Sequence, residues 1–141
     1  MRLEKSYRLI PREMSIEYSA FESGLDRFIR LDKEANFIGK DALVEWQQRG
    51  SDNGFVTIEV LGVVDADARG SEAIYKDGEV VGRGTSGGYG WRCGKSLALG
   101  LVRVDLAKIG TELEIEILGK KYQAIVIEES PFDPTNECLR S

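Results

Sequence analysis

The sequence predicts a mainly β fold of the α+β class, in which an N-terminal helical segment is followed by a small antiparallel β-barrel. Apolar residues recur at helical spacing in the first third of the chain, whereas the remainder consists of short alternating segments separated by glycine-containing turns. The pattern changes between residues 50 and 54, which predicts a helical part over 1–54 and a barrel over 55–141. About five or six short strands favour a closed barrel, because closure removes exposed strand edges.

Two helices are predicted in the first part. Ser15 could cap a short helix whose apolar residues recur at spacings of three to five. These residues are Ile16, Ala20, Phe21 and Leu25. A second helix is predicted over residues 41–49, because Leu43 and Trp46 share a face at helical spacing and Gly50 supplies a stop.

The strands are predicted where β-branched and aromatic residues lie between turn residues. They cover residues 55–60, both arms of 73–82, 96–104, 111–118 and 121–128, with a polar loop over 65–70. Asp77-Gly78 has the composition of a type I′ hairpin turn, and Gly119-Lys120 is predicted as a second hairpin turn.

Charged and apolar residues alternate at period two within 111–118. This alternation predicts one buried face and one solvated face, and it explains the row of glutamates better than a catalytic carboxylate pair does. The buried set is Leu113, Ile115 and Ile117, and the solvated set is Glu112, Glu114 and Glu116.

Composition limits the possible functions. The chain has 141 residues, 42% of them hydrophobic and 30% charged, which suits one globular domain. Its net charge of −5 argues against non-specific nucleic-acid binding, which needs a basic surface. Histidine is absent, so the commonest general base and the commonest zinc ligand are both missing. No apolar run approaches the roughly 20 residues that span a bilayer, and no export signal is visible. We therefore expect neither a nucleic-acid nor a membrane partner.

The two cysteines, Cys93 and Cys138, lie far apart in the sequence and match no metal-binding spacing. They predict reduced thiols, a cytoplasmic location and no metal site.

Two glycine-rich segments resemble nucleotide-binding loops but lack the required context. Residues 82–87 satisfy GxGxxG, yet residues 87–90 are a poor helix start, so a bulged strand end is predicted instead. Gly94-Lys95-Ser96 resembles the end of a phosphate-binding loop, but Tyr89 occupies the position that requires glycine.

The densest basic cluster of the chain comprises Arg2, Lys5, Arg8 and Arg12. Taken alone, it could be a solvated charged surface.

Residues 2–9, however, resemble the RLExxY segment of the aminomethyltransferase (glycine-cleavage T-protein) family. Further segments match that family in order, and together they cover nearly the whole chain. These are 21–25, 37–43, 78–82, 85–87, 94–100 and 131–134. Residues 86–90 and 131–136 are most similar to the folate domain of dimethylglycine and sarcosine dehydrogenases or oxidases.

The resemblance implies that residues 1–54 are part of a folate-binding domain and that 55–141 are the C-terminal barrel of such a protein. It implies tetrahydrofolate as the ligand, FAD only in a separate domain, and a small N-methylated amine as the substrate of the full-length protein. It also implies a fragment that is inactive in isolation, because the family's catalytic aspartate lies upstream of the RLExxY segment. Leu3, Leu9 and Ile10 are accordingly expected to form an exposed apolar patch.

By the same resemblance, Arg2, Glu4 and Tyr7 are expected on the folate-facing wall, with no catalytic residue and no metal ligand in this chain. A carboxylate can accept hydrogen bonds from a pterin, and arginine can pair with the carboxylates of a glutamate tail. Near the position of Glu137 the family often has a tyrosine close to the ligand, and the glutamate of this chain differs from that pattern. The alternative prediction is a non-catalytic protein-interaction barrel that needs no folate and whose glycine-rich segment 85–94 contacts a partner protein.

Overall fold

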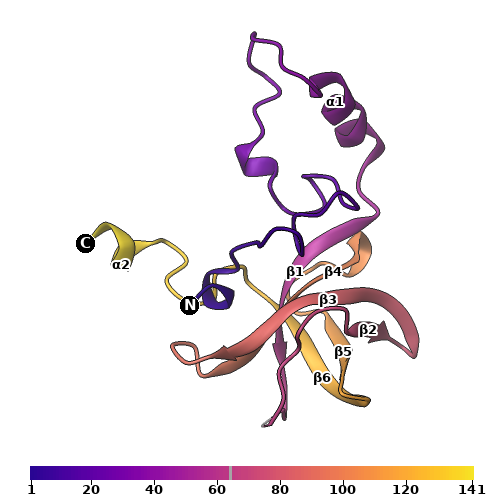
Figure 1. Cartoon of the computed structure of the whole chain (residues 1–141), viewed down its shortest axis with the longest axis vertical. Helices are drawn as coiled ribbons and strands as arrows, with labels where there is room; N and C mark the ends of the chain where they lie inside the picture. The colour runs from indigo at the N-terminus through magenta and orange to yellow at the C-terminus, as the bar shows by residue number, and fades with distance from the viewer. Residues whose placement is uncertain (64) are drawn as a thin grey trace.

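The computed structural model describes residues 1–63 and 65–141 and contains a closed six-stranded antiparallel barrel (Figure 1). The strands are β1 (Asn53–Val60), β2 (Ala73–Lys76), β3 (Glu79–Gly90), β4 (Lys95–Arg103), β5 (Glu112–Ile117) and β6 (Lys120–Ile127). Their order around the barrel is β1-β4-β3-β2-β5-β6. The predicted fold class is therefore confirmed.

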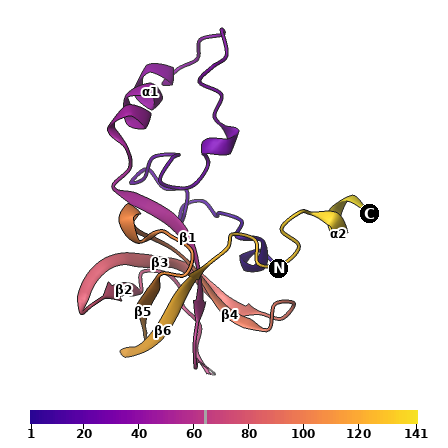
Figure 2. The same ribbon diagram turned by 180° about the vertical axis from the view of Figure 1, so that it is seen from behind.

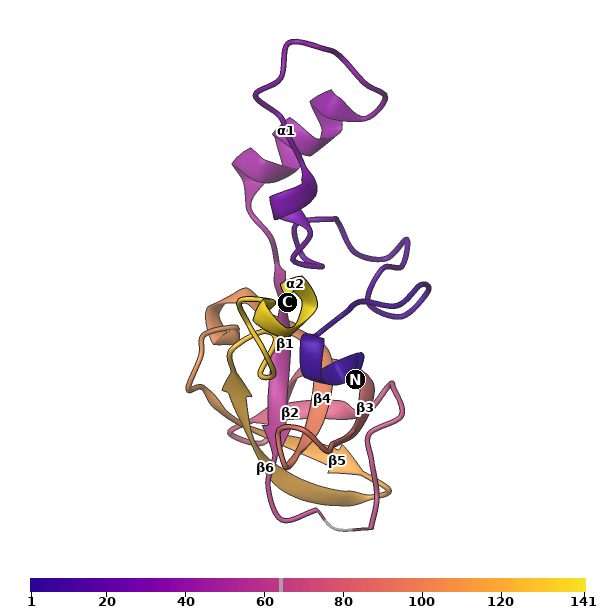
Figure 3. The same cartoon turned by 90° about the vertical axis from the view of Figure 1, so that its left-hand side faces the viewer.

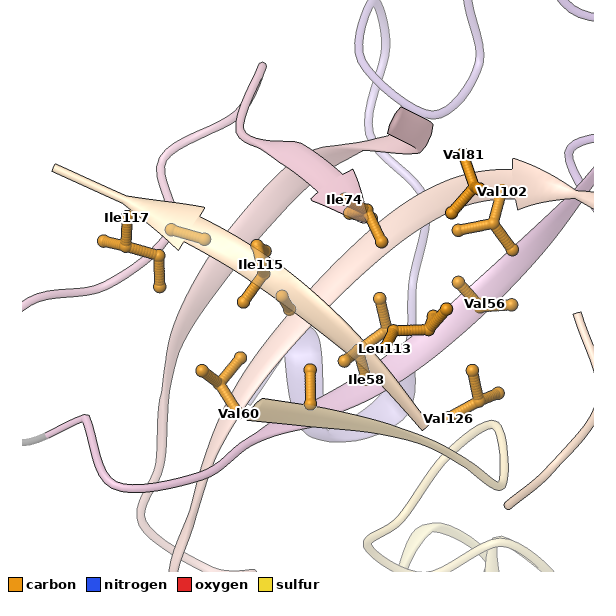
Figure 4. Packing of buried hydrophobic residues seen from close by; sticks show 13 residues of the cluster. Val56, Ile58, Val60, Ile74, Val81, Val102, Leu113, Ile115, Ile117 and Val126 are labelled. Atoms are coloured by element: carbon orange, nitrogen blue, oxygen red, sulfur yellow. The ribbon is translucent and has the colours of Figure 1, made fainter. Parts of the chain in front are cut away.

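Apolar side chains from all six strands fill the barrel (Figure 4). On β5 the alternation is as predicted, since Leu113, Ile115 and Ile117 are buried while the glutamates between them face outward. One of these glutamates, Glu116, accepts a hydrogen bond of 2.9 Å from the Tyr75 hydroxyl, which is an ordinary cross-strand contact.

Both predicted hairpins are present, and one turn is shifted. Asp77 and Gly78 have φ of 52° and 85°, the left-handed backbone that a type I′ turn requires. In the second hairpin the left-handed residues are Leu118 and Gly119, so the predicted Gly119-Lys120 turn was one residue too late. Lys120 instead pairs with Ile117 in the strand ladder. The apolar Leu118 suggested a strand one residue longer, although it breaks the alternation and its side chain is exposed.

The glycine-rich residues 82–87 lie inside β3, and the predicted bulge is present, since the register with β4 shifts between Gly84 and Ser86. The strand does not end there, however, but continues to Gly90. A Cβ at Gly82 would lie 2.7 Å from Val102 Cα and would also collide with Leu101 O. The glycine here permits close approach of two strands.

The first part of the chain is less helical than predicted. Residues 15–25 form turns, and the predicted helix from Ser15 is wrong. The Ser15 hydroxyl accepts only the Glu17 amide at 3.2 Å, and Ile16 is fully exposed, so no apolar helix face is buried there. The described short elements nearby are 3₁₀ helices, η1 (Leu3–Lys5) and η2 (Asp26–Phe28).

The second predicted helix is confirmed as α1 (Lys40–Arg49), which ends at Gly50. Helix α1 and the loops on either side of it project from the barrel, at the top of Figure 3. None of its residues is fully buried. The remaining helical elements are η3 (Val104–Leu106), after β4, and α2 (Glu137–Arg140), in a C-terminal tail that extends sideways from the barrel (Figure 2).

Leu9 and Ile10 are exposed, as expected, whereas Leu3 is half-buried. Among the described residues no helix combines the length and the apolar character needed to cross a bilayer.

We expect Gly82→Ala to lower the free energy of unfolding by roughly 1–3 kcal/mol, because the new methyl group overpacks two backbones that cannot move apart cheaply. Gly88→Ala is the matched control on the same strand, since its Cβ would meet only the end of the Leu3 side chain, at 3.0 Å. Urea denaturation of both variants measures the difference. Equal stabilities would contradict the role assigned to Gly82.

Candidate binding site

Three segments far apart in the sequence surround a cavity of about 510 Å³. The N-terminal residues contribute Arg2, Glu4 and Tyr7, the β3–β4 hairpin contributes Arg92, and the C-terminal tail contributes Phe132. All three residues singled out from the sequence thus line one cavity. Their contacts differ, and so do the roles available to them.

Glu4 is almost completely buried and organises the loop opposite it. Its Oε1 accepts a hydrogen bond of 2.6 Å from the Arg92 amide, and its Oε2 lies 3.0 Å from the Met1 ammonium. Burial alone would raise the pKa of Glu4, but hydrogen bonds from that ammonium and from the amides of Arg92 and Cys93 hold it below its ordinary value. Glu4 is therefore ionised and fixes the hairpin tip beside the cavity.

The C-terminal tail is held to the N-terminal residues by polar contacts. The Lys5 ammonium donates to Asp133 O at 2.5 Å and to Asn136 Oδ1 at 2.7 Å. The Phe132 amide donates to Glu4 O at 3.0 Å. These bonds bring the Phe132 ring to the cavity wall.

Two guanidinium groups remain partly available to a ligand. Arg2 donates to Tyr7 O at 2.7 Å and lies 3.5 Å from Glu13, and its side chain is partly exposed. Arg92 is exposed, and its guanidinium lies over the Phe132 ring, 5.4 Å from the centroid. With the half-exposed Tyr7 ring, the cavity combines cationic groups with aromatic surface.

Beside the cavity, Arg8 ties the N-terminal segment to the chain that follows β6. Its guanidinium pairs with both oxygens of Glu129, donates to Ser23 O at 2.9 Å and to Gly24 O at 3.2 Å, and lies 3.8 Å from the centroid of the Phe55 ring. Its side chain is only 4% exposed. At least Arg8 of the basic cluster is therefore buried, and the cluster is not simply a solvated surface.

Glu13 is a fully buried carboxylate between the N-terminal segment and β3. Its Oε1 accepts hydrogen bonds of 2.6 Å from both the Thr85 and Ser86 hydroxyls, and its Oε2 accepts the Leu9 amide at 2.8 Å. Burial by itself raises the pKa of Glu13, but these donors, aided by the charge of Arg2, lower it overall. The Glu13 carboxylate is therefore ionised where the N-terminal segment meets β3.

Sequence reasoning missed Arg92, Phe132 and Glu13. Phe132 lies in a segment that carried a family motif, so a signal for it existed. Nothing in the local pattern distinguishes Arg92 or Glu13 from surface charges, because their places depend on contacts between distant segments. Within the described part of the chain, no group of three or more Cys, Asp or Glu side chains could hold a metal ion.

Comparison with known families and structures gives a consistent result. Residues 54–133 match the family described as the glycine cleavage T-protein C-terminal barrel domain. A crystal structure of the glycine cleavage system aminomethyltransferase T from Bartonella henselae superposes with a TM-score of 0.85, over 94% of this chain and 37% of that chain, at 24% identity. That likeness supports the fold.

The similarity to curated relatives covers the N-terminal part of the chain as well as the barrel. Human mitochondrial dimethylglycine dehydrogenase is 41% identical over 142 residues, which cover 99% of this chain and 16% of the human protein. An aminomethyltransferase from Synechocystis is 36% identical over 92% of this chain and 34% of its own length. The chain therefore spans only a minor part of each of these relatives.

We expect the free energy of unfolding to fall as the pH is lowered through about 4.5, and Glu13→Gln to weaken this dependence. The pKa of Glu13 is lowered from 4.5 in the folded chain, so the unfolded chain takes up the proton first and acid favours unfolding. Urea denaturation between about pH 3 and 7 measures the slope. The control is Glu112→Gln, which removes an exposed carboxylate at the start of β5. A slope unchanged by Glu13→Gln would contradict the buried-carboxylate account.

Proposed function

Because the chain belongs to the glycine cleavage T-protein C-terminal barrel family, we propose that its N-terminal cavity contributes to a tetrahydrofolate site in a longer, dimethylglycine dehydrogenase-like protein. In that protein, tetrahydrofolate would accept the one-carbon unit released when an N-methylated amine is oxidised elsewhere. The part played by this chain is binding and orientation.

The observation that carries the proposal is the gathering of cations and aromatic rings around one cavity in a chain of net charge −5. Arg2 and Arg92 suit the carboxylates of a glutamate tail, because guanidinium groups pair with carboxylates through two hydrogen bonds. Tyr7 and Phe132 offer flat surfaces to a ring system. A volume of about 510 Å³ lies within the range of small-molecule sites.

Glu4 has a positioning role in this proposal. Its carboxylate already binds the Arg92 amide, so its loss would release the hairpin tip and displace the Arg92 side chain from the cavity. The earlier expectation of a direct bond from Glu4 to the pterin stays a prediction.

The alternative function, a protein-interaction module, has one observation in its favour. Ile16, Phe28 and Ile38 are exposed in the excursion around α1. Such a module would keep its partner binding after the cavity residues are changed, and it would show no affinity for tetrahydrofolate.

We expect Arg2→Ala and Arg92→Ala each to raise the Kd for tetrahydrofolate about tenfold or more, because each removes a charged hydrogen-bond donor worth roughly 1.5–3 kcal/mol. Calorimetric titration of the 141-residue chain, and of the longer protein that contains it, measures this change under reducing conditions. Arg103→Ala is the control, since that exposed arginine pairs with Asp105 outside the cavity.

The amine oxidation rate of the longer protein should stay unchanged in both variants. Folded variants with unaltered folate affinity would remove these arginines from the site. If the longer protein itself did not bind tetrahydrofolate, the interaction-module function would be favoured instead.

A further inference from the structure

A second cavity, also of about 510 Å³, lies between the β1–β2 loop and the β3–β4 hairpin. The hairpin contributes Tyr89, Trp91 and Ser96, and the loop contributes Asp65 and Asp67. It shares no lining residue with the N-terminal cavity, so it does not belong to the proposed folate site.

The two aromatic side chains here are held in solvent. Trp91 is 86% exposed and Tyr89 46% exposed, and their rings meet edge to face with centroids 4.9 Å apart. In an edge-to-face pair, one ring touches its partner only through its edge, so the partner covers neither face of that ring. Core packing does not account for two large rings at the tip of a hairpin, whereas a ligand that binds aromatic faces does.

The two aspartates give the cavity a negative charge. Neither Asp65 nor Asp67 forms an ion pair or a side-chain hydrogen bond with any residue that the structure describes. The two cations nearest the tip of the hairpin are directed elsewhere, since the Lys95 ammonium binds Glu59 at 2.6 Å and Arg92 lies over Phe132. The carboxylates are therefore available to a cation from outside.

Ser96 places a hydroxyl group in the wall of this cavity. Its side chain lines the cavity, and the residue is only 9% exposed. Its hydroxyl has no hydrogen-bond partner among the described residues. No described side-chain polar atom is both fully buried and without a partner, so this hydroxyl oxygen is accessible from the cavity, where it could accept a hydrogen bond from a ligand N–H.

We propose that this cavity binds a small alkylated ammonium ion. The alkyl groups would contact the aromatic faces, where the ring quadrupole attracts a cation. The positive charge would be balanced by Asp65 and Asp67, and an N–H of the ion, where it has one, would be donated to Ser96. An anion would be repelled by the same carboxylates. The proposal is independent of folate binding.

The test uses Trp91 as its reporter. The background variant Trp46→Phe leaves Trp91 as the single tryptophan of the 141-residue chain. Its fluorescence is titrated with tetramethylammonium chloride and with trimethylammonium chloride, and potassium chloride at equal ionic strength is the control. We expect a saturable change with both organic cations and none with potassium.

Variants in this background identify the groups that bind. Asp65→Asn together with Asp67→Asn, and Tyr89→Leu alone, should each raise the Kd at least about fivefold, whereas Tyr89→Phe should leave the Kd for tetramethylammonium unchanged. Ser96→Ala should weaken binding of trimethylammonium, which carries an N–H, and leave that of tetramethylammonium unchanged. Asp105→Asn is the control for loss of an acidic group away from the cavity.

Far-UV circular dichroism establishes that each variant is folded before it is titrated. Failure of both organic cations to produce a saturable change would overturn the proposal. Equal affinities in the parent, the double aspartate variant and Tyr89→Leu would overturn it as well, because binding would then occur elsewhere.

Discussion

The arrangement of the N-terminal segment on the barrel depends on the buried guanidinium of Arg8. An arginine side chain carries five N–H donors and no acceptor, so burial requires several oxygens around it. Glu129 supplies two of these oxygens, Ser23 and Gly24 supply backbone carbonyls, and Phe55 covers the face of the group. A Cβ at Gly24 would lie 2.5 Å from the guanidinium, so the glycine leaves the space that this packing needs. Loss of Glu129 would take two acceptors from the buried Arg8 guanidinium, which destabilises this arrangement because the buried charge is then left without its partner.

The barrel and the cavity are stabilised in different ways. Apolar burial among the strands stabilises the barrel, whereas the walls of the N-terminal cavity are joined by ionised and hydrogen-bonded groups. Glu4 fixes the hairpin tip, Glu13 joins the N-terminal segment to β3, and Lys5 holds the C-terminal tail. Each is a polar group removed from water, which is tolerated only because its partners are in place. The cavity therefore forms only when distant segments come together.

This division explains what the sequence could predict. Strand alternation and turn chemistry are local, so the barrel, the Asp77-Gly78 turn and α1 followed directly from the residues. The helix expected from Ser15 did not form: Ile16 is fully exposed, whereas the polar Glu22 and Ser23 are buried, and apolar spacing alone does not reveal this. Family resemblance predicted a folate-facing wall for Arg2, Glu4 and Tyr7; the structure places all three around one cavity, and their contact with folate stays a prediction. The contact between Glu4 and the Arg92 amide spans 88 positions, and no local pattern encodes it.

Amide hydrogen exchange in Arg8→Met, compared with the parent chain, tests most directly whether polar contacts hold the N-terminal segment on an independently stable barrel. Methionine keeps an unbranched apolar side chain over Phe55 and removes every donor. We predict faster exchange at the amides of Ser23, Gly24 and residues 129, 130 and 132, with unchanged protection in β1, β4 and β6. Unchanged exchange at those amides would contradict the account. A uniform loss of protection across all strands would contradict it too, because the barrel would then depend on the same contacts.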